Sequence, residues 1–175
     1  NVIFRSAQVK ITVSVDSLSI ELCAESVENL VGSLSESEEY KDFYRVLAAH
    51  PSSGVRSAIA SKDKIDAETV RLLSQDPVPN VRLGVLVGEA GRAHLTEAQL
   101  TSLAEGDLVC AETIAGNLGA FQLESDNLAQ LLAKHTDPKV RQCLASNYNV
   151  PKRLLKQLLR DPDPQVRRSA QSSLD

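Results

Sequence analysis

Four arginines each directly follow a valine near the expected start of a helix. A guanidinium repeated in this way could either bind anions or form ion pairs within the protein. They are Arg56, Arg82, Arg141 and Arg167. The interval is 26 residues from the first to the second and again from the third to the fourth. Such a row could bind anions, or each arginine could pair with an aspartate or a helix C-terminal carbonyl of the adjacent unit. The structural interpretation is favoured, because a motif that recurs with a repeat usually encodes the repeat itself.

A cluster of basic side chains near the C-terminal end is the second candidate for chemistry. Between 134 and 168 there are nine Lys or Arg residues against three Asp, although the whole chain has a net charge of −4. The candidate binding residues are Lys152, Arg153, Lys156, Arg160 and Arg168. Three interpretations stay open for them: a solvated helix face, a docking surface for an acidic protein, and a surface for nucleic acid.

Helix signals surround each Val-Arg pair. Asp137 and Asp163 are placed to cap a helix, and Pro138 and Pro164 follow them at a position where a missing N–H costs nothing. Pro79 takes the same place in an earlier unit. A second helix is predicted in each unit, and "SQDP" at 74–77 and "LRDP" at 159–162 end two of these helices because proline blocks continuation.

The apolar pattern predicts helices that pack on one another. Val140, Cys143 and Leu144 recur at i, i+3 and i+4, which places them on one helix face. The i+3 member is small in every unit, so helix axes can approach closely; these residues are Ala58, Gly84, Thr113, Cys143 and Ser169. In the middle unit Cys110 replaces the valine and Ala111 the arginine.

Two short helices per unit cannot bury their faces alone, so the predicted fold is an all-α solenoid of stacked helix pairs. About eleven helices are expected in a single repeat domain over 17–175. The expected units are 17–50, 51–76, 77–105, 106–135 and 136–161, followed by a capping helix at 162–175.

The N-terminal part follows a different pattern. "QVKITVSVD" at 8–16 alternates apolar and polar residues, which is typical of a strand. We expect an arm over 1–16 that is extended or forms half of a hairpin with "VIF" at 2–4, or that pairs with another chain and so allows self-association. A long helix is expected over 17–34, capped by Asp16 or Ser17.

The repeat resembles a known family. "DPKVRQCLASNYNVPKRLLKQLLRDPDPQVR" at 137–167 is similar to the leucine-rich repeat variant family, a bacterial relative of HEAT-like repeats, in its P-x-V-R, L-A-x-N, P-x-x-L-L-x-x-L-L and D-P elements. The stretch at 51–82 is similar with fewer matches. The resemblance implies a right-handed superhelix of paired helices that carries a binding surface. Some members have a cysteine-rich iron-sulfur module, but the sequence has no matching cluster, so no cofactor is implied.

Signals for catalysis and for a metal are weak. The three cysteines are widely spaced without a CxxC pair, and the phosphate-loop and G-x-S-x-G motifs do not occur. His50 and His135 lie beside the prolines between units, and His94 is expected in a loop. None has a Cys or a carboxylate pair at a short, recurring spacing, so each is expected to be solvent-exposed or locally hydrogen-bonded. We therefore expect no enzyme, cofactor or metal. No apolar run of membrane-spanning length and no secretory signal occur, so a cytoplasmic location is expected.

The expected function is a non-enzymatic scaffold that binds a protein partner through a continuous solenoid face, and an acidic protein is one candidate for that partner. The alternative is a HEAT-like array that binds nucleic acid through the repeated arginines and the basic C-terminal units. The acidic pI near 5.4 and the 3% aromatic content speak against the alternative.

Overall fold

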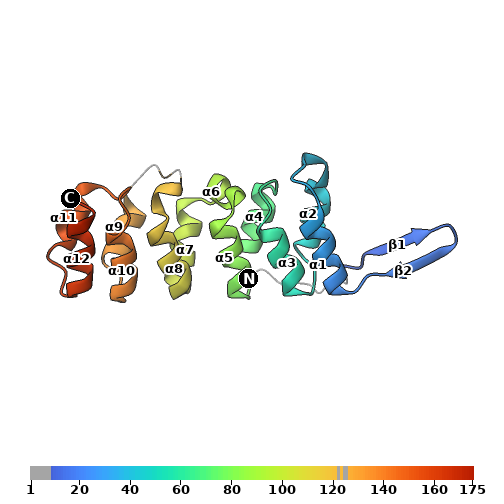
Figure 1. The fold of residues 1–175 in the computed structure, drawn as a ribbon, viewed down its shortest axis with the longest axis horizontal. Coiled ribbons are helices and arrows are strands. Elements are labelled where there is room, and N and C mark those ends of the chain that lie inside the picture. Colours follow the sequence, from blue (N-terminus) through green and yellow to red (C-terminus); the bar gives the residue numbers. More distant parts are fainter. Residues whose placement is uncertain (1–8, 122, 124–125) are drawn as a thin grey trace. The chain divides into compact units, whose positions relative to one another are not determined.

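The computed structural model describes residues 9–121, 123 and 126–175, and this part of the chain is mostly helical (Figure 1). It contains twelve α-helices, two short 3-10 helices and one two-stranded sheet within the described residues. No helix in these ranges has the length and apolar character needed to cross a membrane. The chain divides into two compact units, Asn1–His94 and Leu95–Asp175. The single repeat domain expected over 17–175 stays a prediction.

The first unit, which we call unit 1, contains a hairpin and six α-helices. The strands are β1 (Thr12–Val15) and β2 (Leu18–Glu21), and a 3-10 helix spans Glu38–Tyr40. The helices are α1 (Ala24–Ser33), α2 (Lys41–Leu47), α3 (Ser53–Ala60), α4 (Ala67–Ser74), α5 (Pro79–Val87) and α6 (Glu89–His94). Helices α1, α3 and α5 pack in sequence to form one layer, and α2, α4 and α6 pack in sequence to form the other.

The second unit, unit 2, has the same two-layer construction. Its helices are α7 (Glu97–Gly106), α8 (Leu108–Gly116), α9 (Asn127–Ala133), α10 (Pro138–Ala145), α11 (Lys152–Leu158) and α12 (Pro164–Ser172), and a 3-10 helix spans Leu118–Ala120. Helices α8, α10 and α12 form one layer (Figure 1), and α7, α9 and α11 form the other. The expected boundaries at 106, 136 and 162 each lie two residues before a helix of the first layer.

The predicted caps are confirmed where the sequence places them. The Asp137 carboxylate accepts a hydrogen bond from the Lys139 amide at 2.8 Å, and the Asp163 carboxylate accepts from the Gln165 amide at 2.7 Å. Pro138 is the first residue of its helix, where its missing N–H needs no partner. These bonds set the helix starts, and therefore also the register of the packing face.

The predicted packing face is buried. Val55 and Ile59 in α3 and Val140 and Leu144 in α10 are fully buried. Gly84 shows why the i+3 position is small, since a Cβ atom there would lie 3.0 Å from the Cβ atom of Ala60 in α3. A larger side chain would force α3 and α5 apart.

The prediction of a helix over 17–34 is wrong in its first third. The N-terminal arm does not end at residue 16 but continues through a second strand. Residues 18–21 form β2, which pairs antiparallel with β1 in the register Val13↔Ile20 and Val15↔Leu18. Asp16 makes the turn possible with φ of 52° at the first central position of a two-residue connection. The period-2 alternation continues beyond this turn, and α1 starts only at Ala24.

The hairpin carries an apolar face that the described helices leave uncovered. Val13, Val15, Leu18 and Ile20 share that face through the strand register, and all four are exposed. The pairing expected with 2–4 lies outside the described residues. Self-association through this arm stays a prediction.

His94 lies in a helix and not in the loop that the sequence indicated. It is the last residue of α6, the additional helix that raises the count from the expected eleven to twelve within the described chain. Gly88, just before this helix, and Gly91 within it both have low helix propensity. Gly91 allows close packing, because a Cβ atom at this position would lie 1.8 Å from the carbonyl oxygen of Val85 in α5.

Truncation of Leu144 should reveal the packing energy of α10. We expect Leu144→Ala to lower the free energy of unfolding by about 2 to 5 kcal/mol, because it empties a fully buried position. Arg168→Ala, an exposed position on α12, should change it by less than about 0.5 kcal/mol. Denaturant titrations of both variants measure the difference, and equal losses would contradict the assigned helix face.

Candidate functional site

The repeated arginine of α3 is buried against an aspartate that follows α4. Arg56 donates from Nε to Oδ2 of Asp76 at 2.6 Å and from Nη2 to Oδ1 at 3.1 Å, which is a two-pronged ion pair. Its Nη1 donates to the carbonyl oxygens of His50 and Pro51, both at 2.9 Å. The guanidinium therefore joins the end of α4 to the segment that leads into α3.

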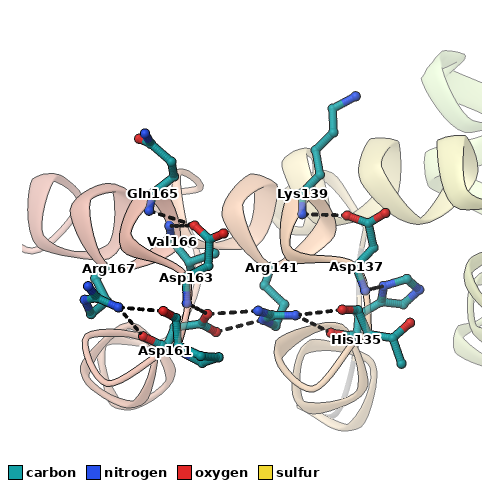
Figure 2. Close-up of polar contacts among 11 residues, drawn as sticks. His135, Asp137, Lys139, Arg141, Asp161, Asp163, Gln165, Val166 and Arg167 are labelled. Carbon is teal, nitrogen blue, oxygen red and sulfur yellow. Dashed lines mark hydrogen bonds and ion pairs between the residues drawn. The ribbon is translucent and has the colours of Figure 1, made fainter.

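The same arrangement occurs in unit 2 (Figure 2). Arg141 of α10 donates to Asp161 from Nε at 2.7 Å and from Nη2 at 2.9 Å. Its Nη1 donates to the carbonyl oxygens of His135 and Thr136. Because four donor contacts of the guanidinium are made inside the unit, it has little capacity left for an external anion.

Each of these aspartates also holds the next arginine of the row. The backbone oxygen of Asp161 accepts from Nη1 of Arg167 at 2.7 Å, and its carboxylate accepts from the Asp163 amide at 2.9 Å (Figure 2). In unit 1 the backbone oxygen of Asp76 accepts from Nη1 of Arg82 at 2.6 Å. We call each set an Arg–Asp chain. The members are Arg56, Asp76 and Arg82 in unit 1, and Arg141, Asp161 and Arg167 in unit 2.

The electrostatics of the unit 2 chain favour the structural interpretation of the arginine row. The His135 carbonyl partner of Arg141 lies in the adjacent predicted repeat, as expected, but its aspartate lies in the same predicted repeat, 136–161. The side chains of Arg141 and Asp161 are 11% and 6% exposed. The hydrogen bonds from Arg141 lower the pKa of the Asp161 carboxyl, so the buried carboxylate stays charged and paired. Leaving one such charge without its partner would be costly.

A histidine precedes each Arg–Asp chain, and its carbonyl oxygen accepts from the first arginine of that chain. The Nδ1 atom of His50 accepts from the Ser52 amide at 3.1 Å, and Nδ1 of His135 accepts from the Asp137 amide at the same distance. Each imidazole therefore accepts from the amide two residues later in the chain. The carboxylates of Asp76 and Asp161 make the same contact 26 residues further on. Burial lowers the pKa of His50, because the charged imidazolium is poorly solvated there and stands close to Arg56.

A basic hollow lies on the other layer of unit 2, between α9 and α11. It has a volume of about 530 Å³, and Arg153, Lys156 and Arg160 contribute its positive charges. Ala133 and Leu158 give it an apolar floor. Three of the five predicted binding residues therefore meet at one depression.

Two further hollows adjoin the first one through shared residues. A hollow of about 250 Å³ shares Arg153 and Gln157 with the first, and adds Gln130 and Lys134. A third, of about 520 Å³, shares Gln130 and Lys134 with the second and reaches Glu105 of α7. We call the three together the unit 2 groove. It crosses α7, α9 and α11, the layer that does not contain the repeated arginines.

Lys152 and Arg168 do not line the unit 2 groove. Lys152 is the exposed first residue of α11, and Arg168 of α12 makes a hydrogen bond to Gln165. Lys152 lies one helical turn before Lys156, at the N-terminal end of α11, and Arg168 lies on α12, in the other helix layer.

The sequence interpretation overlooked Lys134 and Gln130 as groove residues. The sequence does contain a signal for Lys134. The carbonyl oxygens of His135 and Asp161 accept from equivalent arginines, and Lys134 precedes the first of them as Arg160 precedes the second. Gln130 lies 26 residues before Lys156, which is the repeat interval. Aligning the second helices on that interval would have found both.

The groove cations differ in how they are paired. Arg153 forms an ion pair with Asp126, at the start of α9. Lys134, Lys156 and Arg160 have no ion-pair partner among the residues that the structure describes. The carboxylate of Asp161 at the groove edge is already bound by Arg141. The groove therefore offers unneutralised positive charge on a chain whose net charge is −4.

Candidate catalytic and metal-binding groups are not brought together in the described part of the chain. No group of three or more His, Cys, Asp or Glu side chains there could hold a metal ion. Cys110 is buried, and burial raises the pKa of the Cys143 thiol, which disfavours a reactive thiolate. The structure thus gives these cysteines packing roles on α8 and α10.

Comparison with protein-family models, curated proteins and solved structures gives no match for this chain.

Loss of the buried ion pair should destabilise the fold much more than loss of an exposed one. We expect Asp161→Ala to lower the free energy of unfolding by about 3 to 5 kcal/mol, because Arg141 would keep its buried charge without a partner. Asp126→Ala removes the half-exposed pair with Arg153 and should cost less than about 1 kcal/mol. Denaturant titrations compare the two, and equal costs would contradict the role assigned to the Arg–Asp chain.

The lowered pKa of His50 predicts a pH dependence of stability. Its ordinary pKa is 6.5, and in the folded state the value is lower, so the unfolded chain takes up the proton first as the pH falls. The stability associated with neutral His50 is present above about pH 6.5 and is lost as the pH falls towards the folded-state pKa. His50→Asn keeps an acceptor for the Ser52 amide but does not titrate. Melting temperatures across this range should fall less steeply in the variant, and parallel curves would contradict the assignment.

Proposed function

We propose that this protein is a non-enzymatic interaction module, an α-solenoid whose exposed second layer binds a protein partner. The resemblance to the leucine-rich repeat variant family is part of this proposal. The two-layer packing of successive helices within each unit supports it. In a repeat of this kind each repeat contacts only its neighbours, and the array presents extended surfaces that can bind a partner.

The observation that carries the proposal is the unit 2 groove. Protein clefts that collect unpaired charge of one sign attract partners of the opposite sign and speed their association. Here three unpaired cations and Arg153 converge on α9 and α11, while the chain as a whole is acidic.

Nucleic acid is the weaker candidate for the same surface. The repeated arginines that a HEAT-like array would direct to phosphates instead donate to aspartates and carbonyl oxygens inside each unit. The lining of the groove contains no Phe, Tyr or Trp in the described hollows, so it offers no ring on which an unpaired base could stack. A protein partner therefore fits the surface better.

Charge reversal in the groove tests the module. We expect Lys156→Glu combined with Arg160→Glu to lose a partner that the wild-type protein captures from its native host, with little change in melting temperature because both side chains are exposed. The matched control is Lys152→Glu with Arg168→Glu, the same charge change on exposed residues outside the groove. Mass spectrometry identifies the partner, and binding is then measured with the purified protein.

The control also separates the alternatives. Equal retention of the purified partner by both double variants would reject the groove as the binding surface. Capture that disappears after nuclease treatment would favour nucleic acid.

A further inference from the structure

We propose that the unit 2 groove binds its partner as a short extended peptide rich in Asp or Glu. This inference rests on the proposed function and names the chemistry of the partner at the same site. Four observations support the inference: the length of the groove, its positive charge, its two amide side chains and the pairing of one groove cation with a carboxylate of the same chain.

The length of the groove fits a few residues of extended chain. Helix α9 packs between α7 and α11, and packed helices lie about 8 to 10 Å apart. A groove that crosses all three is therefore about 20 Å long, which corresponds to about six residues of extended backbone. Its three hollows, of about 530, 250 and 520 Å³, can each hold one or more side chains.

The charges of the groove select an acidic sequence. Arg153, Lys156 and Arg160 line the first hollow, and Arg153 and Lys134 line the second. Glu105 lies only at the α7 end, in the third hollow. The attraction for carboxylates is therefore strongest between α9 and α11, and an acidic peptide should place its charges there.

Two amide side chains can bind the backbone of such a peptide. Gln130 of α9 and Gln157 of α11 are both exposed and both line the second hollow. Each offers an N–H₂ donor and a carbonyl acceptor, which an extended peptide needs because its own N–H and C=O groups are unpaired. Leu131, which is half-buried, adds apolar contact area in the third hollow. This combination fits a polypeptide better than a row of phosphates.

Asp126 is an intramolecular competitor for one groove cation, because its carboxylate pairs with Arg153. A carboxylate of the peptide would compete with it for the same guanidinium. Asp126 makes no side-chain cap to α9 although it precedes that helix, so its removal leaves the helix start intact. Asp126→Asn should therefore bind an acidic peptide more tightly than the wild type does.

Fluorescence anisotropy with defined probes tests the inference. The first probe is a labelled peptide in which glutamate alternates with valine. The second has lysine in place of glutamate, and the third is an oligothymidylate of the same charge as the first. The wild-type chain should bind the first probe in a salt-dependent way and should not bind the second. Lys156→Glu with Arg160→Glu should weaken binding about tenfold, and Asp126→Asn should strengthen it about threefold.

The control variant is again Lys152→Glu with Arg168→Glu. It should weaken binding of the first probe by only about threefold or less, because neither side chain lines the groove, although Lys152 lies one helical turn from Lys156. Equal weakening by both double variants would overturn the inference, as would unchanged affinity of Asp126→Asn. Preference for the oligothymidylate would overturn it in favour of nucleic acid. If the acidic peptide fails while the purified partner still depends on Lys156 and Arg160, the peptide inference falls and the interaction module stands.

Discussion

The buried pair between Arg141 and Asp161, with its counterpart in unit 1, sets the geometry on which the rest of each unit depends. Removing both charges from water costs free energy, and the cost is offset only when nearly every donor and acceptor has a partner. Arg141 meets this condition with two contacts to the carboxylate and two to backbone carbonyls. One side chain thereby fixes the distance between the end of α11 and the start of α10.

The aspartate extends this constraint to the next helix. Its carboxylate holds the preceding arginine and the amide that starts the following helix, and its backbone oxygen holds the following arginine. A substitution at Asp161 would therefore disturb its contacts with α10 and with α12 at the same time. Arg56 and Arg141 are accordingly committed to contacts inside each unit. The α7, α9 and α11 layer of unit 2 instead leaves Lys134, Lys156 and Arg160 without ion-pair partners among the described residues.

Much of the fold could be predicted from local signals. Pro138 and Asp137 mark a helix start because the geometry of a helix end accepts a missing N–H and needs a side-chain acceptor. Val140 and Leu144 indicate the buried face because their spacing matches the helical period. The same logic failed at 17–22, where Asp16 adopts a positive φ and continues the strand pattern into a hairpin. It also failed at Gly91, whose packing against Val85 is not visible in a sequence window.

The sequence by itself determined the helix starts, the packing faces and the presence of a basic C-terminal stretch, because these depend on residues within a few positions of one another. Only the tertiary structure decided which basic residues act together. It placed Lys134 and Gln130 beside Arg153, and it left Lys152 and Arg168 outside the groove. It also showed that Arg141 is bound by an aspartate that lies twenty residues later in the chain. Such partnerships depend on how helices pack, and packing distances are set by side chains far apart in the sequence.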